Sequence, residues 1–128
     1  MGILHGLLGN ASEVDIDQVE KELLPLLAPA EDVEKAFRLI RDLFIFTNKR
    51  LILIDKQGIS GKKTEYHSIP YRNIAHFSVE SAGHFDLDSE LKIWVKGMNG
   101  PITKTFRNSS NIVAIQQSIA TYIFTVEA

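Results

Sequence analysis

The sequence of 128 residues contains no cysteine. This excludes a disulfide framework, a zinc site built on thiolates and a cysteine nucleophile. A basic excess is missing as well, because 14 lysine and arginine residues stand against 16 aspartate and glutamate residues, for a formal net charge of −2. Proteins that bind nucleic acid normally carry a basic excess, so we expect no nucleic-acid partner. The composition that remains, 45% hydrophobic and 23% charged, is that of one ordinary globular domain.

Long apolar runs are also missing. The longest, Leu43–Phe46 and Leu51–Ile54, are far shorter than the ~20 residues that cross a membrane. The apolar beginning Met1–Leu8 has no lysine or arginine before Lys21, and it is too short and broken for a secretory signal. We therefore expect a soluble cytoplasmic protein, in which Met1–Asn10 is an arm that packs on its own domain or on a neighbour.

The first 30 residues predict a short amphipathic helix. Ser12 followed by Asp15 is typical of a helix start. Pro25 lacks a backbone donor and should end or kink the helix. We expect residues 1–30 to form an arm and helix that pack on the domain or a neighbour, and residues 31–128 to form the domain. Apolar residues recur at helical spacing along one stripe: Ile16, Val19, Leu23 and Leu26.

From Val33 onward the apolar pattern changes to the alternation of short strands. Asn48–Lys49 is a two-residue hairpin turn, Pro70 ends a strand, and Gly97–Pro101 is a further turn. The pattern predicts about seven strands, at residues 33–40, 43–47, 50–54, 63–69, 74–81, 90–96 and 102–106.

The chain closes with a different pattern. Asn108–Ser110 is typical of a helix start, and the apolar residues that follow recur on one helical face: Ile112, Ile115, Ile119, Tyr122 and Ile123. Short strands followed by one amphipathic helix indicate a mostly β fold, in which a small barrel or two packed sheets have an open end plugged by the helix.

Three blocks of the chain resemble bacterial pleckstrin-homology-like domains: Phe46–Asp55, Ser68–Ile74 and Phe85–Trp94. The resemblance covers most of the chain, residues 33–124. It implies a barrel of two near-orthogonal antiparallel sheets capped by the C-terminal helix, with an additional N-terminal helix. It also implies assembly into cyclic rings, pentameric in single-domain members, and no known catalytic activity. The biological role of such members is unassigned, and this fold serves as a platform for lipids, peptides and proteins alike.

We expect no enzyme, no cofactor and no metal. None of the four histidines, His5, His67, His76 and His84, lies in a Ser-His-Asp-like motif. His84, Asp86, Asp88 and Glu90 alternate, so in an extended segment they could share a face and hold a divalent ion. However, Leu91 stands where a calcium loop requires its glycine, and we interpret the segment as a solvated entry to a strand.

A protein-interaction surface is the favoured function, because polar residues on the turns of a rigid barrel are the usual place for recognition. The alternative that these side chains are only solvated stays open. The candidates for contact with a protein partner that the sequence does not identify are Lys49, Arg50, Glu80, Asp86, Asp88 and Glu90.

Binding of anionic lipid headgroups at a membrane surface is the alternative function. The resemblance suggests it, because eukaryotic relatives of the fold read phosphoinositides with basic residues on the first hairpin. Here that hairpin offers only Arg38 and Arg41, next to Asp42. Anionic lipid recognition needs a cluster of 4–8 basic residues. The remaining basic residues are spread over two turns and interrupted by Asp55: Lys49, Arg50, Lys56, Lys62 and Lys63.

The apolar strands predict assembly. Leu43–Phe46 and Leu51–Ile54 are apolar on both faces, and Trp94 lies on the polar face of its strand. This is more apolar surface than a barrel interior uses, and the N-terminal helix can cover only part of it. A neighbouring copy would cover the rest, in agreement with the implied ring. We therefore expect a homo-oligomer, a pentamer, whose interface includes or adjoins either Trp94 or the strand formed by Leu43, Phe44, Ile45 and Phe46.

Overall fold

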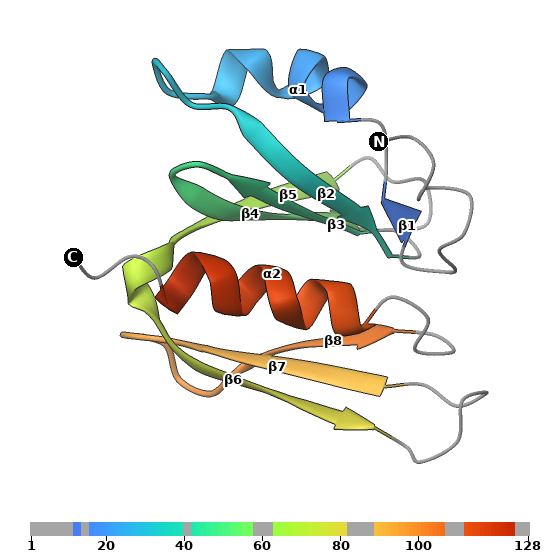
Figure 1. Cartoon of the computed structure of the whole chain (residues 1–128), viewed down its shortest axis with the longest axis vertical. Coiled ribbons are helices and arrows are strands. Elements are labelled where there is room, and N and C mark those ends of the chain that lie inside the picture. Colours follow the sequence, from blue (N-terminus) through green and yellow to red (C-terminus); the bar gives the residue numbers. More distant parts are fainter. Residues whose placement is uncertain are drawn as a thin grey trace.

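The computed structural model describes residues 12–13, 16–39, 42–57, 63–81, 89–106 and 112–124, which form two antiparallel sheets and two α-helices (Figure 1). The first sheet contains, in spatial order, β1 (Ser12–Glu13), β2 (Val33–Arg38), β3 (Leu43–Thr47), β4 (Arg50–Gln57) and β5 (Lys63–Pro70). The second contains β6 (Ile74–Ser81), β7 (Ser89–Val95) and β8 (Ile102–Phe106). The helices are α1 (Ile16–Leu23) and α2 (Ile112–Phe124), and short 3₁₀ turns occupy Leu24–Leu26 and Tyr71–Asn73.

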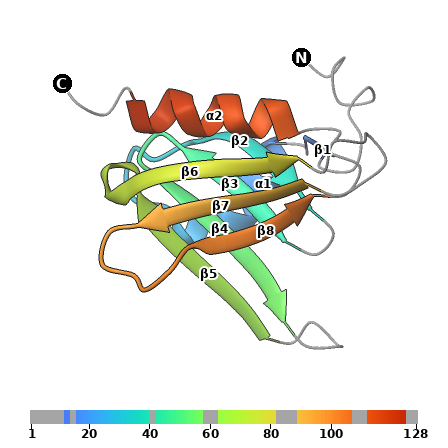
Figure 2. The ribbon, with the colours of Figure 1, turned by 90° about the horizontal axis from the view of Figure 1, so that it is seen from below.

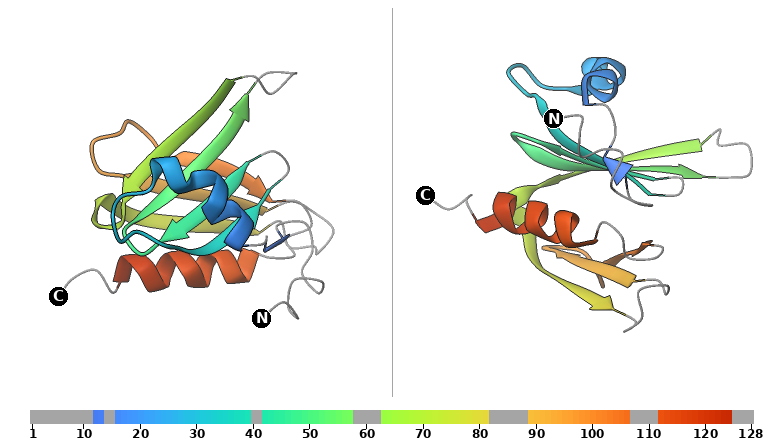
Figure 3. Two further views of the ribbon diagram at one scale, coloured as in Figure 1. Left: turned by 90° about the horizontal axis from the view of Figure 1, so that it is seen from above. Right: turned by 45° about the vertical axis from the view of Figure 1, so that its right-hand side comes forward.

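The elements stack in layers. Figure 1 shows α1 on one side of the first sheet, and Figures 1 and 2 together show α2 along the open side where the two sheets separate. Figure 2 shows β4 and β5 crossing the strands of the second sheet at a steep angle, and the left view of Figure 3 shows α1 lying across the first sheet. The fold class expected from the sequence is confirmed, with seven main strands near their predicted positions and one additional short strand, β1.

The predicted start of the first helix is wrong. Ser12 and Glu13 are extended and pair with Arg38 and Phe37 at the edge of β2, and α1 begins at Ile16. Pairing satisfies backbone groups that the edge strand would otherwise leave open. The proline was interpreted correctly, because the α-helix ends at Leu23 and the chain continues as a 3₁₀ turn with proline in its first positions, where a missing N–H costs nothing.

Strand β3 is buried on both of its faces, over all five residues. Phe44 and Phe46 point into the barrel, where Phe44 contacts Phe106 of β8 edge-on at 6.0 Å between ring centroids. Leu43 and Ile45 point the other way, into a second cluster with two residues of α1, Val19 and Leu23.

This arrangement corrects the expectation that the apolar strand needs a neighbouring copy. The exposed fractions of Leu43, Phe44, Ile45 and Phe46 are between 0 and 9% within the single chain. The N-terminal helix supplies the cover that was assigned in part to a second protomer. These four side chains are therefore interior residues of one chain, and of the five predicted interface residues only Trp94 is partly exposed.

Strand β2 departs from the simple alternation expected of it. The register shifts between Val33 and Lys35, and the neighbours Ala36 and Phe37 are both buried, on opposite faces. Two apolar clusters on the two sides of the sheet require consecutive apolar residues, as in β3.

Helix α2 buries the face that its spacing predicts, with Ile112, Ile115 and Ile119 in the barrel core. Its Tyr122 stacks on Tyr71 at 4.9 Å between ring centroids, and its hydroxyl donates to Glu34 Oε1 of β2 at 2.5 Å. The helix thus closes the barrel. Through Tyr122 it contacts both β2 and the 3₁₀ turn that follows β5.

Candidate functional site

The turn between β3 and β4 fastens the segment that joins α1 to β2. Asn48 Oδ1 accepts the N–H of Asp32 at 2.8 Å, and Asn48 Nδ2 donates to the carbonyl oxygen of Ala30 at 3.0 Å. Thr47 Oγ1 accepts the N–H of Arg50 at 2.9 Å and so closes the turn itself. Asn48, which the sequence predicted as a turn residue, therefore also hydrogen-bonds the backbone of a loop more than 15 positions away in sequence.

A buried carboxylate lies beneath this turn. Glu31 is 5% exposed, and Arg50 binds it with two nitrogens, Nε to Oε2 at 2.8 Å and Nη2 to Oε1 at 2.9 Å. Thr47 Oγ1 donates to Oε2 at 2.7 Å, and the N–H of Ala28 donates to Oε1 at 2.8 Å. Burial alone would raise the pKa of Glu31, but these hydrogen bonds and the charge of Arg50 outweigh it and lower the pKa from 4.5 to about 2.

Arg50 is mainly a structural residue that joins several segments, and we call this arrangement the Arg50 clamp. Besides Glu31, its Nη2 donates to the carbonyl oxygen of Leu26 at 2.8 Å, and its Nη1 donates to Ser68 Oγ at 2.9 Å. The guanidinium thus joins the end of the N-terminal helical segment to β5. Arg50 was predicted to take part in recognition, and the structure gives it this structural task as well. Glu31 was missed, because a glutamate next to Asp32 in a loop carries no sequence signal of burial.

Arg50 also lines an open groove of about 550 Å³, which we call the Lys49 groove. Its polar lining consists of Glu31, Lys49, Arg50 and Ser68, and its apolar lining of Leu26, Ala28 and Pro70. Glu31 and Arg50 neutralise each other within the groove, whereas the exposed Lys49 side chain makes no ion pair among the described residues. The groove therefore carries a net positive charge.

Other predicted residues come together on the solvent side of the second sheet. Glu80 of β6 lies directly opposite Glu90 of β7, and Lys92 Nζ is 4.0 Å from Glu90 Oε1. Nearer the other end of the same strands, His76 stacks on Trp94 at 4.4 Å between ring centroids. We call this surface the Trp94 face. It consists of the side chains that alternate with the buried ones: His76, Ser78, Glu80, Glu90, Lys92, Trp94, Thr103 and Thr105.

The predicted interaction surface is thus divided. Lys49 and Arg50 lie at a turn of the first sheet, while Glu80 and Glu90 lie on the second sheet. Asp86 and Asp88 are outside the described residues, as are His5 and His84 and the arm Met1–Asn10. Within the described ranges, no three histidine, aspartate or glutamate side chains come together in a way that could hold a metal ion.

The end of the first sheet away from the groove carries both signs of charge. Arg38, Lys56 and Lys63 share this end, as the strand register requires. Here Lys104 Nζ of β8 lies 3.2 Å from Asp42 Oδ2 and 3.9 Å from Asp55 Oδ2 and so links the two sheets.

The carboxyl group of Asp42 is perturbed by this position. Burial raises its pKa above the usual value, the bond and charge of Lys104 offset part of this effect, and neighbouring Asp55 adds to it. In the described part of the chain, neither helix has the length and hydropathy that a membrane-spanning helix needs.

Known proteins with the same architecture match this chain over nearly its whole length. The model of the Bacterial PH domain family matches residues 2–123. The uncharacterized protein YjqA of Bacillus subtilis is 56% identical over 121 residues, which cover 94% of this chain and 97% of that protein.

Two crystal structures agree. A pleckstrin homology domain from Shewanella amazonensis has a TM-score of 0.84 and 52% identity, with 95% of this chain and 98% of that chain covered. A DUF1696 family protein with a pleckstrin-homology domain from Shewanella loihica has a TM-score of 0.79 and 51% identity, with 90% and 98% covered. The chain therefore belongs to the bacterial pleckstrin-homology domain family.

Proposed function

We propose that the protein is a non-catalytic scaffold that assembles with further copies of itself and binds proteins, with the Trp94 face as its principal contact surface. The observation that carries the proposal is the half-buried Trp94, stacked on His76 on the central strand of a three-stranded sheet. A large aromatic side chain on a rigid element, surrounded by polar groups, is typical of the centre of a protein interface.

The chemistry of the described residues supports a binding role over catalysis. Glu31, the buried carboxylate, is held ionised by Arg50 and its other partners, and so is not poised to exchange a proton near neutral pH. Burial raises the pKa of Tyr71, whose hydroxyl donates to the carbonyl oxygen of Thr47 at 2.6 Å and serves the fold. The family relatives named above also include none with an enzymatic name.

The same surface supports the proposed self-assembly. The predicted pentamer requires a head-to-tail contact between copies. Since Leu43–Phe46 are covered within the chain, Trp94 is the predicted interface residue that a neighbouring copy can reach.

Replacing Trp94 by alanine is expected to dissociate the assembly. Light scattering at micromolar concentration should give a multiple of 14.4 kDa for the native chain, fivefold for the ring, and a clearly smaller mass for Trp94→Ala. Val113→Ala is the control, because Val113 is an exposed apolar residue on α2, outside the Trp94 face. A native chain that scatters as a monomer of 14.4 kDa would overturn the assembly proposal.

Lipid binding is the second candidate, favoured by the shared position of Arg38, Lys56 and Lys63 at one end of the first sheet. Asp55 and Glu65 lie directly opposite each other among these cations, and three cations are fewer than an anionic membrane site needs.

We expect vesicles of phosphatidylcholine and phosphatidylserine to retain little of the protein at physiological salt, because the dispersed cations are screened. Sedimentation with the vesicles measures this. Strong retention that weakens with salt and disappears in Lys56→Glu/Lys63→Glu would favour the lipid function over the scaffold.

A further inference from the structure

The Lys49 groove offers hydrogen-bond donors that the fold does not use. Four of the five N–H groups of Arg50 are bound to Glu31, Leu26 and Ser68, which leaves one on Nη1 without a partner among the described residues. The hydroxyl of Ser68 accepts from Arg50 and keeps its own hydrogen to donate. With the ammonium group of Lys49, three donors of net positive charge line one groove.

The carboxylate of Glu31 does not compete for these donors. Both of its oxygens are already saturated by Arg50, Thr47 and Ala28, and it lies at 5% exposure beneath the guanidinium. The groove is therefore complementary to an added anion rather than to a cation.

Apolar contacts continue from the groove along β5. Leu26, which lines the groove, is 47% exposed, and Pro70 of β5 lines the groove as well. Ser68 and Tyr66 follow Pro70 at alternate positions, and all three share one face of the strand because they pair with Arg50, Ile52 and Ile54.

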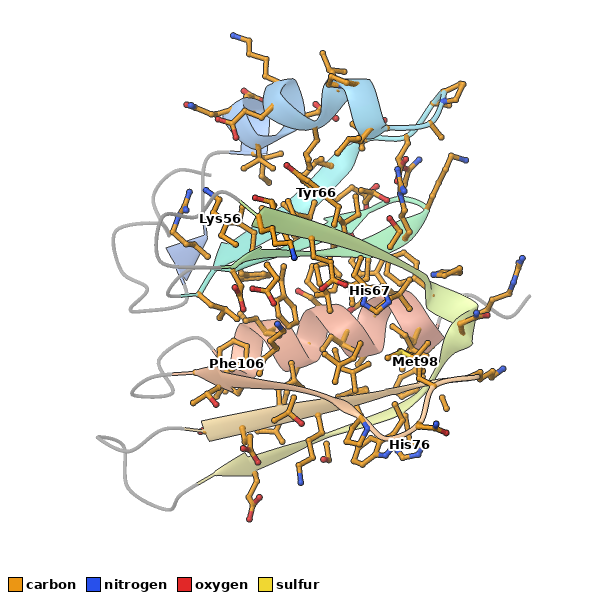
Figure 4. The ribbon with its side chains drawn as sticks, turned by 180° about the vertical axis from the view of Figure 1, so that it is seen from behind. Lys56, Tyr66, His67, His76, Met98 and Phe106 are labelled. Carbon is orange, nitrogen blue, oxygen red and sulfur yellow. The ribbon has the colours of Figure 1, made fainter. Side chains whose placement is uncertain are left out.

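Figure 4 shows Tyr66 on the side of β5 that faces α1, and His67 on the opposite side, towards α2. Tyr66 is 51% exposed. The stripe thus runs from the basic groove to an aromatic side chain over about four residues, or ~13 Å of extended chain.

We propose that the Lys49 groove and this stripe bind a short extended peptide that alternates acidic and apolar residues. A carboxylate of the peptide binds Lys49, the remaining N–H of Arg50 and the hydroxyl of Ser68. Its apolar side chains pack on Leu26, Pro70 and Tyr66. The inference rests on the proposed protein-binding function and names the partner's chemistry at a second surface, separate from the Trp94 face.

An extended peptide fits better than a compact small molecule. Small-molecule sites bury 70–90% of their ligand, whereas of the residues that line this groove only Glu31 is buried. An open strip beside a strand is the usual arrangement for recognition of an extended segment.

The test uses a fluorescein-labelled peptide, acetyl-Ser-Leu-Asp-Leu-Asp-Leu-Ser, and fluorescence anisotropy with the full chain. We expect saturable binding that weakens with salt, and at least about tenfold weaker binding of the same peptide with asparagine in place of aspartate. Lys49→Glu should weaken binding by at least about tenfold, and the fold should keep its stability because the Lys49 side chain makes no hydrogen bond or ion pair with described residues.

The matched control is Lys63→Glu, which makes the same charge change at the far end of β5, on the face opposite to Tyr66, Ser68 and Pro70, and should bind like the native chain. Leu26→Ser should weaken binding several-fold through loss of the apolar wall. Equal binding of the two peptides, or unchanged binding by Lys49→Glu, would overturn the proposal.

Two further measurements test whether the groove instead binds a second copy of this chain or a membrane. A fall in the scattering mass of Lys49→Glu would assign the groove to a second copy of this chain and overturn the separate partner. Retention on phosphatidylserine vesicles that Lys49→Glu abolishes, without peptide binding, would assign it to a membrane. The scattering mass of Trp94→Ala is measured separately from peptide binding. A failure of the peptide proposal and a failure of the scaffold proposal therefore give different results.

Discussion

Replacement of Arg50 by methionine is expected to lower the free energy of unfolding by about 3 kcal/mol near pH 7. Methionine fills part of the space but leaves the carboxylate of Glu31 buried without its bidentate partner. It also removes the links to Leu26 and Ser68. Urea unfolding followed by circular dichroism measures the change. A loss of less than about 0.5 kcal/mol, the range of ordinary surface substitutions, would contradict the clamp.

The loss of stability in Arg50→Met should depend on pH, and the pKa of Glu31 sets the direction of this dependence. The pKa of Glu31 is lowered in the folded chain, from 4.5 to about 2, so its stabilising effect is present above pH 4.5 and is lost as the pH falls from 4.5 towards 2. Without Arg50 the main cause of the lowering is gone, and burial then favours the protonated form. The deficit of Arg50→Met should therefore narrow as the pH is lowered.

Two variants control for packing. Arg50→Lys keeps the charge but loses the bidentate geometry, and should fall between the native chain and Arg50→Met. The double variant Glu31→Gln/Arg50→Met removes both charges. It should recover part of the loss near pH 7, and its own free energy of unfolding should no longer change with pH through position 31. A deficit that stays constant with pH in Arg50→Met would mean that lost packing, not the unpaired carboxylate, destabilises it.

Replacement of Leu23 by alanine should be similarly damaging, with a loss of about 3 kcal/mol. Leu23 is 4% exposed and packs with Ile45 and Ile52 on the face of the first sheet that α1 covers, so truncation leaves a cavity there. We also expect increased binding of an apolar dye, because loosening of α1 exposes β3 and β4. Thermal and urea unfolding measure the loss.

The neighbouring position supplies the control. Leu24 is 60% exposed, and Leu24→Ala should change the free energy of unfolding by less than about 0.5 kcal/mol. Equal and small effects at Leu23 and Leu24 would indicate that α1 is a separable arm. A large effect at Leu23 alone would make the N-terminal helix part of the domain core, rather than an attachment to residues 31–128.

The elements with local signals could be predicted from the sequence. The hairpin at Asn48–Lys49, the strand ending at Pro70 and the face of α2 formed by Ile112, Ile115 and Ile119 are where the pattern put them. Each depends on neighbours within a few positions: a turn residue, a missing backbone donor or a helical repeat. The start of α1 failed because the competing interaction, pairing of Ser12 and Glu13 with β2, lies some 25 positions away.

The candidate surfaces could be predicted only in part. Lys49, Glu80, Glu90 and Trp94 are at least partly exposed, as side chains outside the apolar periodicity should be. The sequence could not divide them between two surfaces, because that depends on which sheet each strand joins. Nor could the sequence predict the structural role of Arg50. An arginine on a turn can point into solvent or can bind a buried carboxylate from a distant segment, as Arg50 binds Glu31.

By itself, then, the sequence determined the strand and helix pattern, the two-sided apolar character of Leu43–Phe46 and the near balance of charge. Only the tertiary structure decided what covers that strand and which charges are used internally. The physical reason is the separation in sequence over which each interaction acts. Periodicity and turn chemistry act between near neighbours, whereas the packing of α1 on Ile45 and the burial of Glu31 under Arg50 join segments about 20 positions apart.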